Sequence, residues 1–565
     1  MTAVVAGVDI GNATTEVAVL AGGRLLGTDR LPTRGRKGSA ESVRGAAALV
    51  RRAERRLGVV VTEASIAPLR AVDTATLAVP ALPPRTGRLR VLAAGVPTPG
   101  GAGTCVGQPL ALDAPDPAAG PRIVLVPPGL GYAAAAAQVR RLIDTGVPVG
   151  AVLAAGDEGV LIANRLAAPV PVIDQVDTVA AAACPLLAVE VRAPGQPLTM
   201  LTDPVALGAA LRLGDGEAAD AVTLSRLLLD YSNAVIGLAG PGTGNGAGAG
   251  PAAEPWLLTQ GRRVPLREAC AELAGWPPGT VSALGTAAGE TPVDDLYALD
   301  LALVADSATA RRGSTGRTVL AASLHRAGAG PDHAALLGEL LGRPVHCLIS
   351  EPAAARLGAR TTPGAREDAT VVDVGAGTID VIAPDGEVVA AGAGDLLTAA
   401  VAELLTLPRA AADWVKRGPC VRVTGSQRFE AEDGSHGFLD RPVAAAALGM
   451  LAAPGPAGLL PFDRRHSPAE WRAIRLRLKE AVFAANLLRA LRALSTQTSA
   501  QPGAQVLIVG GPAGDDELLG VLLRALPGGV TAGRGNVGGT LPGAPAGHRH
   551  AAALGLALAV QAAAG

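Results

Sequence analysis

The chain has 565 residues and a formal net charge of −1, from 49 Lys and Arg residues against 50 Asp and Glu residues. This length exceeds what one compact core fills, so we expect about two to four domains rather than a single small binding module. Because both signs of charge are scattered, the sequence has no basic stripe that could follow a nucleic-acid backbone. We therefore expect no nucleic-acid partner.

Aromatic residues make up 2% of the chain, and much of its apolar content is alanine, which is typical of Ala-rich helices. The apolar stretch at 443–460 is interrupted by Pro454 and Pro456, and the stretch from Ala551 is shorter than a bilayer is thick. We predict no membrane partner and no transmembrane segment. The opening run AVVAGVDIG has the composition of a strand and no features of a secretion signal, so we expect a cytoplasmic protein.

The five cysteines are odd in number, lie far apart and never form a CxxC pair, so they indicate neither a disulfide framework nor a metal cluster. We expect them to be buried thiols. The one close histidine pair, His548 and His550, lies on either side of an arginine. We expect these two histidines to have a structural or surface role and not to bind a metal. The cysteines are Cys105, Cys184, Cys270, Cys347 and Cys420.

The first informative segment is AVVAGVDIGNATTEVAVLAGGRLL, close to the N-terminus. A β-rich run ends at Asp9, turns through residues 11–14, and resumes as a second strand that Gly22 and Gly23 close. This pattern predicts a β-hairpin with a polar tip.

The segment DATVVDVGAGTIDVIAPDGEVVA repeats this pattern 364 residues later. A single D-x-G-x-x-T sequence is a common turn with an Asp cap, but two in register favour a shared chemistry. The residues Asp373, Gly375, Gly377, Thr378 and Asp380 fall in the same order as Asp9, Gly11, Ala13, Thr14 and Glu16.

These residue types suit the binding of phosphates. Glycines let the backbone turn tightly and expose its N–H groups to an anion, and threonine hydroxyls add donors. An aspartate at the end of a strand can hold Mg²⁺ or its water ligands against phosphate charge. We therefore expect one hairpin from each of two lobes to hold a nucleotide, with Asp9 and Asp373 as the catalytic candidates.

The hairpin pair resembles the phosphate-1 and phosphate-2 loops of the superfamily of actin, sugar kinases and heat-shock chaperone ATPases. SEPAAARLGA, with Glu351, resembles the connecting helix of that superfamily, and QVLIVGGP resembles its adenosine loop. Residues 413–416 resemble its acid-x-x-Lys helix beside adenine, and HRHAAALGLALAVQAAA resembles its closing helix. The resemblance implies a two-lobed α/β ATPase of the actin-like, heat-shock chaperone type that binds ATP or ADP with Mg²⁺.

Lys416 has the alternative of being a solvated charge at a helix end, but the chain has only three lysines, which favours a role for it. Ser467–Pro468–Ala469–Glu470 is a capping box with proline at the first helical position, so we assign the helix that follows to the scaffold. By the resemblance, the nucleotide-binding residues are Gly11, Asn12, Ala13, Thr14, Gly375, Gly377, Thr378, Asp413, Trp414, Val415, Lys416, Gly511, Pro512 and Arg549.

The middle of the chain belongs to neither lobe and ends in a stretch rich in Gly, Pro and Ala, which is typical of a flexible linker. An inserted domain is the simplest explanation. We expect a first ATPase lobe with the first phosphate hairpin at 1–91, an inserted α/β domain at 92–240, and the linker at 241–256. The remainder of the ATPase, with the second hairpin and the adenosine loop, is expected at 257–565.

Within the insert, RIVLVPPGLGYAAAAAQVRRLID predicts a strand, a turn and a helix with a GxGxxA sequence at Gly129, and GAVLAAGDEG predicts a second strand that ends at Asp157. This imitates a dinucleotide-binding fold. Two prolines precede the glycine turn, and the insert has too few strands for a full cofactor domain, so we do not expect nicotinamide or flavin binding.

TPGGAG at Thr98, GDEGVLIANRLAAPVPVID from Gly156 to Asp174, and AGRGNVGG from Ala532 resemble segments of the large subunit of diol and glycerol dehydratase reactivating factors. The similarity covers nearly the whole chain. It implies ATP-dependent release of damaged cobalamin from an inactivated adenosylcobalamin-dependent dehydratase, and an inserted domain that swivels. It also implies a small reactivase subunit as partner, in an assembly of two large and two small subunits.

The resemblance further implies a second Mg²⁺ site in the inserted domain, formed by Thr98, Asp157 and Asp174, near the small subunit. Hard oxygen ligands suit Mg²⁺, although spacing alone would make Asp157 a turn residue and Asp174 a surface acid. The sequence departs from the family in two places. Position 413 is Asp where Glu is common, and the stretch between Gly535 and Arg549 is longer and richer in Gly and Pro.

Other functions remain open on the sequence alone. A sugar or acid kinase of the same superfamily would need a catalytic aspartate and polar sugar ligands in the cleft, and we find no kinase-specific motif. A scaffold that binds nucleotide without hydrolysis and an ethanolamine ammonia-lyase reactivase are further alternatives. An activator of hydroxyacyl dehydratases is disfavoured because it would need a cysteine-held cluster.

Overall fold

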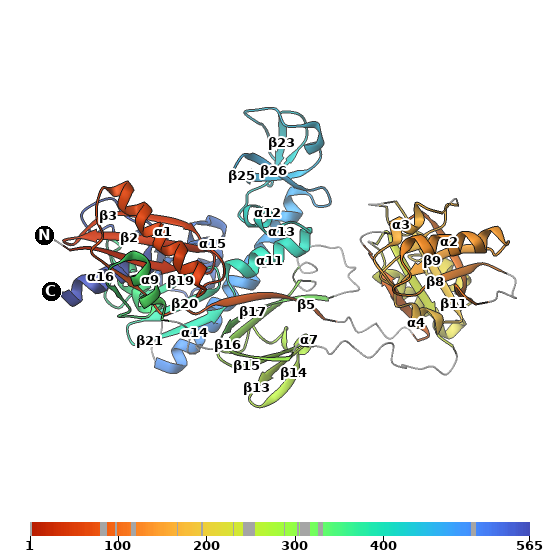
Figure 1. Ribbon diagram of the computed structural model, residues 1–565, viewed down its shortest axis with the longest axis horizontal. Helices are drawn as coiled ribbons and strands as arrows, with labels where there is room; N and C mark the ends of the chain where they lie inside the picture. The colour runs from red at the N-terminus through yellow and green to blue at the C-terminus, as the bar shows by residue number, and fades with distance from the viewer. Residues whose placement is uncertain are drawn as a thin grey trace. The chain divides into compact units, whose positions relative to one another are not determined.

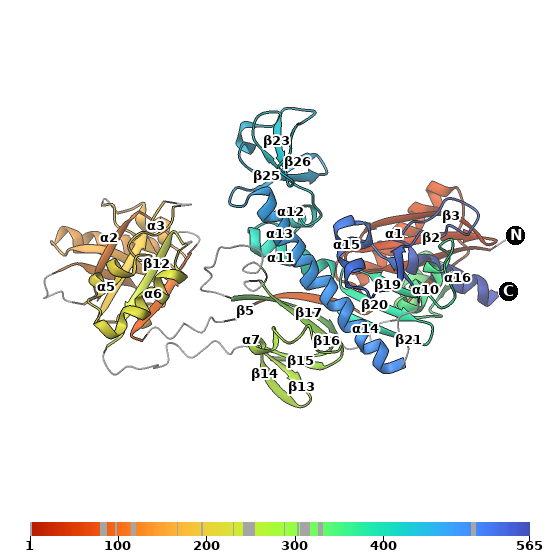
Figure 2. The same ribbon diagram turned by 180° about the vertical axis from the view of Figure 1, so that it is seen from behind.

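The computed structural model consists of two compact units, which Figure 1 and Figure 2 show from opposite sides. The first unit comprises Met1–Val79, Glu254–Thr309 and Thr318–Gly565, and the second comprises Pro80–Ala253 and Ala310–Arg317. The linker expected at 241–256 lies outside the described residues except for its last two. The structure describes residues 3–79, 87–96, 99–114, 120–166, 168–193, 196–229, 231–240, 255–286, 289–301, 304, 317–325, 332–498 and 504–564.

The first unit contains two five-stranded sheets with the same strand order. One consists of the antiparallel strands β1 (Val4–Ile10), β2 (Thr14–Ala21) and β3 (Arg24–Pro32), extended in parallel by β4 (Glu63–Ile66) and β18 (Val345–His346). The other consists of the antiparallel β19 (Thr370–Val374), β20 (Thr378–Ala383) and β21 (Gly386–Ala391), extended by β27 (Gln505–Val509) and β28 (Thr531–Arg534). The repetition confirms the two-lobed actin-like fold.

Two helices lie between these sheets, α10 (Glu351–Ala359) and α16 (Ala551–Ala564), and share one buried core with both. Their backbones touch where they cross. A Cβ atom on Gly358 would overlap the carbonyl oxygen of Ala551, and a Cβ atom on Gly555 would overlap that of Ala354. Glycine is therefore required at both positions of the crossing.

Helices α1 (Ala40–Leu57) and α9 (His333–Leu341) cover the other face of the first sheet. Helix α1 begins where the Ser39 side chain accepts a hydrogen bond from the Ser42 amide, and it ends at Gly58, which has a left-handed conformation with φ of 67°. Its apolar face, which includes Val43, Leu49 and Val50, is buried against the sheet.

A six-stranded sheet in the same unit has the order β14–β13–β15–β16–β17–β5. The chain leaves this sheet after β5 for the second unit and returns to it at β13, so both connections to the inserted unit start from one sheet. Its strands are β5 (Val72–Val79), β13 (Trp256–Thr259), β14 (Arg262–Pro265), β15 (Val281–Thr286), β16 (Gly289–Asp300) and β17 (Arg317–His325).

The second lobe carries an antiparallel sheet of its own, visible beyond α12 in Figure 1. It follows α11 (Gly394–Leu405) and α12 (Arg409–Val415) and consists of β22 (Val421–Val423), β23 (Arg428–Ala431), β24 (His436–Phe438), β25 (Leu451–Gly455) and β26 (Gly458–Asp463). The helix α13 (Pro468–Lys479) continues through a π-helical turn at 480–484 into α14 (Ala485–Thr498). The capping box predicted at Ser467 is confirmed, since Ser467 Oγ accepts the Glu470 amide and Glu470 accepts the Ser467 amide.

The second unit is built on a seven-stranded sheet, β10–β9–β8–β7–β11–β12–β6. The strand, turn and helix predicted around Gly129 are confirmed as β8 (Arg122–Val126), α2 (Tyr132–Asp144) and the next strand β9 (Val149–Ala154). The other strands are β6 (Leu89–Ala94), β7 (Gly103–Ala111), β10 (Val172–Ile173), β11 (Leu186–Val191) and β12 (Asn233–Leu238), and the other helices are α3 (Gly159–Ala163), α4 (Thr178–Ala182), α5 (Pro204–Leu211) and α6 (Ala218–Leu227).

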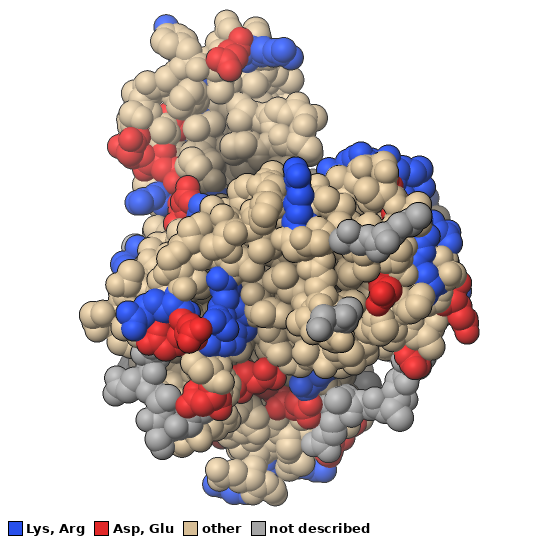
Figure 3. Space-filling view, turned by 90° about the vertical axis from the view of Figure 1, so that its left-hand side faces the viewer, with Lys and Arg blue, Asp and Glu red and all other residues tan. Residues whose placement is uncertain are grey.

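The expectation of five buried cysteines is wrong for Cys347, which is exposed because it lies in the surface segment between β18 and α10, and Cys270 is only half-buried. Within the described part of the chain, no helix combines the length and the apolar composition that crossing a membrane requires. On the face shown in Figure 3, positive and negative side chains are scattered among uncharged ones, in agreement with their scatter along the sequence.

Candidate functional site

The first phosphate hairpin joins β1 to β2. Asp9, near the end of β1, pairs with Glu16 in the ladder, and the Gly11 amide donates to the Thr14 carbonyl oxygen at 2.9 Å. A Cβ atom on Gly11 would lie 2.9 Å from the same carbonyl oxygen, so the tight turn needs a glycine here.

The second phosphate hairpin, between β19 and β20, has the same geometry. Asp373 pairs with Asp380 in the ladder, and the Gly375 amide donates to the Thr378 carbonyl oxygen, again at 2.9 Å. The two hairpins predicted from the sequence are thus present, with equivalent residues in equivalent positions.

The two hairpin tips meet. The Asn12 side chain donates to the Val72 carbonyl oxygen at 2.5 Å and accepts the Val72 amide at 3.4 Å. A Cβ atom on Gly377 would lie 2.9 Å from Asn12 Nδ2 and 2.7 Å from Val72 Cβ. The absence of a side chain at Gly377 therefore lets the tip of the second hairpin approach the first across the cleft.

A cavity of about 630 Å³ lies between the two lobes, which is within the range of about 300–1,000 Å³ typical of small-molecule sites. It is lined by both catalytic candidates and by every predicted nucleotide residue except Val415, whose side chain is fully buried in the core. The predicted residues on its wall are Asp9, Gly11, Asn12, Ala13, Thr14, Asp373, Gly375, Gly377, Thr378, Asp413, Trp414, Lys416, Gly511, Pro512 and Arg549.

One end of this cavity is formed by the loop after β27. Gly510 has φ of 94°, and a Cβ atom on it would overlap Asp373 Oδ1, so glycine lets this loop pass behind the carboxylate. A Cβ atom on Gly511 would lie 3.0 Å from a guanidinium nitrogen of Arg549. Arg549 therefore lies beside the adenosine-type loop, despite the long Gly- and Pro-rich stretch before it.

The end of α12 forms another part of the cavity wall. Lys416 Nζ lies 2.7 Å from Asp413 Oδ1 and donates to Thr398 Oγ1 at 2.7 Å. Burial lowers the pKa of Lys416 below its ordinary value, although Asp413 opposes this. Arg417 pairs with Asp413 as well, and its guanidinium stands 4.8 Å from the ring centre of Trp414. The acid-x-x-Lys sequence thus forms one rigid polar group.

The phosphate end of the cavity is rich in buried and half-buried carboxylates. Burial raises the pKa of Asp9 well above its ordinary value, with Glu351 adding to the shift and Lys37 opposing it. Burial likewise raises the pKa of Asp373 to about 7, and Glu351 contributes again. The pKa of Asp380 is raised for the same reason, burial first and then Glu351. These groups carry negative charge only at a cost, which a bound cation would offset.

Lys37 is a residue of this cleft that the sequence reasoning missed. Its Nζ lies 2.7 Å from Glu351 Oε2, and its side chain is 7% exposed. Burial opposes its charge, but Glu351 and Asp9 raise its pKa above the ordinary lysine value. The scarcity of lysine in the sequence, which drew attention to Lys416, would have indicated Lys37 as well.

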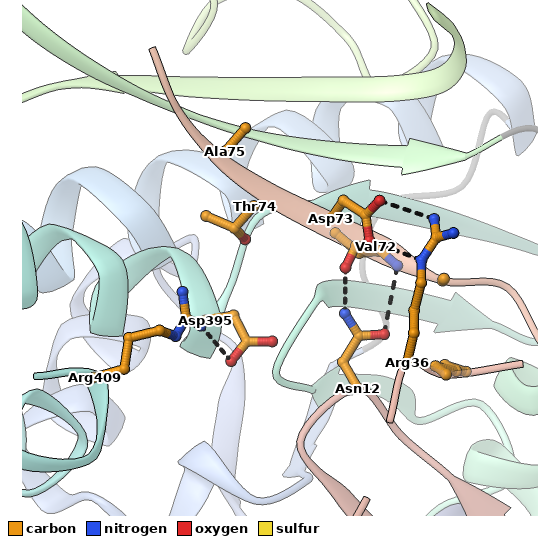
Figure 4. A pocket seen from close by; sticks show the side chains of 10 residues that line it. Asn12, Arg36, Val72, Asp73, Thr74, Ala75, Asp395 and Arg409 are labelled. Atoms are coloured by element: carbon orange, nitrogen blue, oxygen red, sulfur yellow. Dashed lines mark hydrogen bonds and ion pairs between the residues drawn. The ribbon is translucent and has the colours of Figure 1, made fainter. Parts of the chain in front are cut away.

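A second, smaller cavity of about 440 Å³ shares Asn12 and Val72 with the first. Figure 4 shows that Arg36 reaches the carboxylate of Asp73 there, with both oxygens bonded at 3.0 and 2.8 Å. Arg409 lies 3.4 Å from Asp395 on the opposite wall. The charges lining this second cavity are therefore largely paired.

The residues expected to hold a second Mg²⁺ lie in the second unit. Asp157 is exposed in the loop after β9 and accepts a hydrogen bond from Gln175 Nε2 at 3.3 Å, whereas Asp174 is fully buried and accepts the Gly159 amide at 2.8 Å. Thr98 lies outside the described residues. Its neighbour Gly100 exchanges backbone hydrogen bonds with Val172, which precedes Asp174 by two residues. No three His, Cys, Asp or Glu side chains of the described residues gather closely enough to hold a metal ion by themselves.

Comparisons with known proteins agree with this architecture. A family model described as the diol dehydratase reactivase ATPase-like domain matches residues 285–560, and one described as the DD-reactivating factor swiveling domain matches residues 92–242. The propanediol dehydratase-reactivating factor large subunit of Citrobacter freundii is 29% identical over 98% of both chains. The diol dehydratase-reactivating factor large subunit of Klebsiella michiganensis is also 29% identical, with the same coverage.

Two solved structures match over the full length. That of a diol dehydratase-reactivating factor in nucleotide-free form gives a TM-score of 0.60 at 27% identity and covers 99% of this chain and 100% of its own. A glycerol dehydratase reactivase gives 0.57 at 26% identity, with the same coverage. The two lobes and their paired hairpins define an ATPase of the actin-like class with an inserted swivelling domain. Within that class, the chain belongs to the diol dehydratase reactivase family.

Proposed function

We propose that this chain hydrolyses ATP to reactivate an adenosylcobalamin-dependent diol or glycerol dehydratase, by releasing damaged cobalamin so that intact coenzyme can bind. The observation that carries the proposal is the pair of equivalent phosphate hairpins that meet across one cavity, each with a half-buried aspartate on the cavity wall. The relatives that match from end to end bear the names of dehydratase-reactivating factors.

In this proposal the two hairpin tips hold the phosphates. The backbone amides around Gly11 and Gly375 and the hydroxyls of Thr14 and Thr378 supply donors, as in other backbone cradles for anions. The adenosine end lies between the loop 510–512 and the end of α12, which closes off that side of the cavity. The nucleotide therefore contacts both lobes and can hold them together.

The carboxylates at the phosphate end of the cavity fit a divalent cation. Asp9 and Asp373 are hard oxygen ligands of the kind that Mg²⁺ takes, and burial makes their negative charge costly without a cation nearby. Bound Mg²⁺ would neutralise charge that develops on the phosphates. The role of the chain's own residues is to fix the phosphates, orient an attacking water and exclude bulk solvent.

The proposed partner is a small reactivase subunit, in an assembly of two large and two small subunits, and the proposed docking region is the second unit. Loops bearing Asp157 and Asp174 lie at the ends of the adjacent parallel strands β9 and β10. Apolar side chains are exposed close by in sequence, with Val160 39%, Leu161 43% and Val179 81% accessible. A Mg²⁺ ion held by Thr98, Asp157 and Asp174 would fix these loops for a partner, and this ion is part of the proposal.

The first test is ATP turnover by the purified chain. Replacing Asp9→Asn or Asp373→Asn removes a preorganised charge, so we expect turnover to fall at least about a hundredfold. Asp385→Asn, an exposed carboxylate in the β20–β21 turn, is the matched control and should leave turnover unchanged. Turnover at the wild-type rate in both cleft variants would overturn the assignment.

The second test addresses the client. With a small reactivase subunit, ATP and Mg²⁺, the chain should restore activity to a glycerol-inactivated dehydratase when free adenosylcobalamin is present, and should not restore it without the coenzyme. Robust phosphorylation of a sugar or an organic acid, with no effect on the dehydratase, would instead identify a kinase.

A further inference from the structure

The tip of the second phosphate hairpin is held by a neighbouring segment, residues 391–395, which connects β21 to α11. The Gly392 amide donates to the Gly377 carbonyl oxygen at 2.8 Å, and the Asp395 amide donates to the Ala376 carbonyl oxygen at 2.8 Å. These bonds fix the backbone of the tip at two consecutive carbonyl groups. The position of segment 391–395 thus sets the position of the tip.

A fully buried polar cluster holds this segment from behind. Asn486 Nδ2 donates to the carbonyl oxygens of Ala391 at 2.7 Å and Gly392 at 2.6 Å. Asn486 Oδ1 accepts from Arg489 at 2.6 Å, and Arg489 also pairs with Asp295 at 3.0 Å. Asp295 closes the ring by accepting the Ala391 amide at 2.8 Å. Each of the three residues is at most 1% exposed.

The helix that carries this cluster is deformed immediately before it. The π-helical turn at 480–484 directly precedes α14, and the Tyr297 hydroxyl donates to the Ala481 carbonyl oxygen within that turn at 2.6 Å. A π turn inserts an extra residue into the helical repeat and so changes the direction of the side chains that follow it. The π-helical turn therefore helps to direct the side chains of Asn486 and Arg489 toward segment 391–395.

Such a cluster is costly as a stabilising device. An ion pair and an amide lose their hydration when they are buried, and apolar side chains of the same size would avoid this cost. The cluster therefore contributes a defined geometry more than it contributes stability. Here the defined geometry is that of segment 391–395. Gly392 has φ of 96°, and a Cβ atom on it would lie 3.1 Å from Asn486 Nδ2. The side-chain amide of Asn486 therefore packs closely against segment 391–395.

We infer that Asn486, with Arg489 and Asp295 behind it, is a positioning residue for ATP hydrolysis. It holds the second hairpin tip where the terminal phosphate of ATP must lie. The inference rests on the proposed function, because it assigns a role within the same ATP site. A displacement of about 1 Å at a reacting group can cost on the order of a hundredfold in rate, so the cluster can act without contacting the nucleotide.

The decisive variant is Asn486→Asp, which keeps the size of the side chain and its contact with Arg489. It sets a carboxylate oxygen against the two carbonyl oxygens that the amide now binds, so segment 391–395 must shift. We expect kcat for ATP to fall at least about tenfold, because the tip is misplaced at the terminal phosphate. We expect the calorimetric Kd for ADP to change less than about threefold, because the adenosine end of the cavity is untouched.

The matched control is Asn233→Asp in the second unit. Asn233 is 1% exposed and also bonds backbone, with Nδ2 donating to the Val96 carbonyl oxygen at 3.0 Å and Oδ1 accepting the Val96 amide at 2.9 Å. It should lower the melting temperature of its unit and leave ATP kcat unchanged. A purely structural role for Asn486 would give the same result as this control.

If wild-type protein hydrolyses ATP and Asn486→Asp retains the wild-type kcat, the inference fails while the proposed function stands. If wild-type protein neither binds nor hydrolyses ATP, the proposed function itself fails. Should Asn486→Asp not fold, Arg489→Lys is the second variant, because lysine keeps the ion pair with Asp295. It should also lower kcat for ATP while the Kd for ADP stays nearly unchanged. Hydrogen exchange of the wild-type protein tests the same coupling without a substitution. ATP should slow exchange of the Gly392 and Asp395 amides and of the amides in the second hairpin tip. If ATP slows exchange in the tip but not at Gly392 and Asp395, the coupling is contradicted.

Discussion

Lys37 Nζ lies 2.7 Å from Glu351 Oε2, and this salt bridge joins two segments that are 314 residues apart at the phosphate end of the cavity. The pair places a buried positive charge near Asp9, which is half-buried on the cavity wall and whose pKa is raised well above its ordinary value. In the cleft, Lys37 thus offsets part of the carboxylate charge.

We predict that Lys37→Met lowers ATP turnover by about tenfold to a hundredfold, because a preorganised positive charge at the phosphates is lost. ADP affinity should change less than turnover does, and Lys37→Arg should retain part of the activity because it keeps the charge. Steady-state hydrolysis together with calorimetric titration of ADP measures both quantities.

Arg36→Ala is the neighbouring control, since Arg36 is 57% exposed and pairs with Asp73 in the second cavity. It should leave turnover within about a factor of two, as expected for an exposed ion pair. An equal effect of the Lys37 and Arg36 substitutions would show that Lys37 has no special role.

Stability should depend on pH through the buried carboxylates. Burial raises the folded-state pKa of Asp373 to about 7 from an ordinary value of 3.8, so the folded protein keeps a proton that the unfolded chain loses. This contribution to stability is complete below pH 4 and is lost as the pH rises through 7. The nucleotide-free protein should therefore melt at a lower temperature at pH 8 than at pH 5.5.

Asp373→Asn should reduce this pH dependence and raise the melting temperature at pH 8, although it lowers turnover. Mg²⁺ with nucleotide should stabilise the wild-type protein more at pH 8 than at pH 5.5, because the ionised carboxylates then have a cation. Scanning calorimetry at both pH values checks these statements. A melting temperature that rises from pH 5.5 to pH 8, with an unchanged slope in Asp373→Asn, would contradict them.

In the second unit, Asp157→Ala should weaken binding of the small subunit by at least about tenfold, because it removes a charged ligand from a Mg²⁺ site with few protein donors. ATP hydrolysis by the isolated chain should stay at the wild-type rate. Asp157 is the better target than Asp174, since Asp174 is buried and also holds the Gly159 amide, so its loss would disturb the loop.

The control is Asp203→Ala, another exposed carboxylate of the same unit, which caps α5. Titrating the small subunit by calorimetry, with and without a chelator, measures the effect. If Asp157→Ala binds as tightly as wild type and the chelator makes no difference, the loop residues form no metal site.

The crossing of α10 and α16 should tolerate no side chain. Gly358→Ala and Gly555→Ala each force a methyl group against a backbone carbonyl, which should lower the free energy of unfolding by about 1–3 kcal/mol or more. Gly208→Ala, in α5 with open space at its Cβ position, should be neutral or stabilising by up to about 1 kcal/mol. Denaturant unfolding gives these values, and similar values for all three would refute the role of the crossing.

The sequence was sufficient to predict the phosphate hairpins because their signal is local. Asp9, Gly11 and Thr14 fall within six residues, and the same pattern at Asp373 identified the second hairpin. Helix phase explains the position of Val415: Asp413 and Lys416 are three residues apart and share a face of α12, whereas Val415 points into the core.

The remaining parts of the site depend on contacts that the sequence does not record. Asn486 reaches Ala391 across 95 residues and Arg489 reaches Asp295 across 194, and neither carries a motif. The packing of α14 against β21, together with the contact between β21 and β16, brings these groups together. Such buried polar contacts between distant segments can be recognised once the fold is known, but not from spacing along the chain.

The distribution of lysine has a practical consequence for chemical labelling. The chain has three lysines, all within the described residues, and their side chains are 7%, 15% and 0% exposed at Lys37, Lys416 and Lys479. A reagent that acylates primary amines therefore finds no exposed lysine side chain on the folded protein. Slow acylation at Lys37 and Lys416 would report how often the cleft opens, since both line it, while Lys479 would react only on unfolding. The acylation rates of Lys37 and Lys416 can thus be used to follow opening of the cleft without introducing a label.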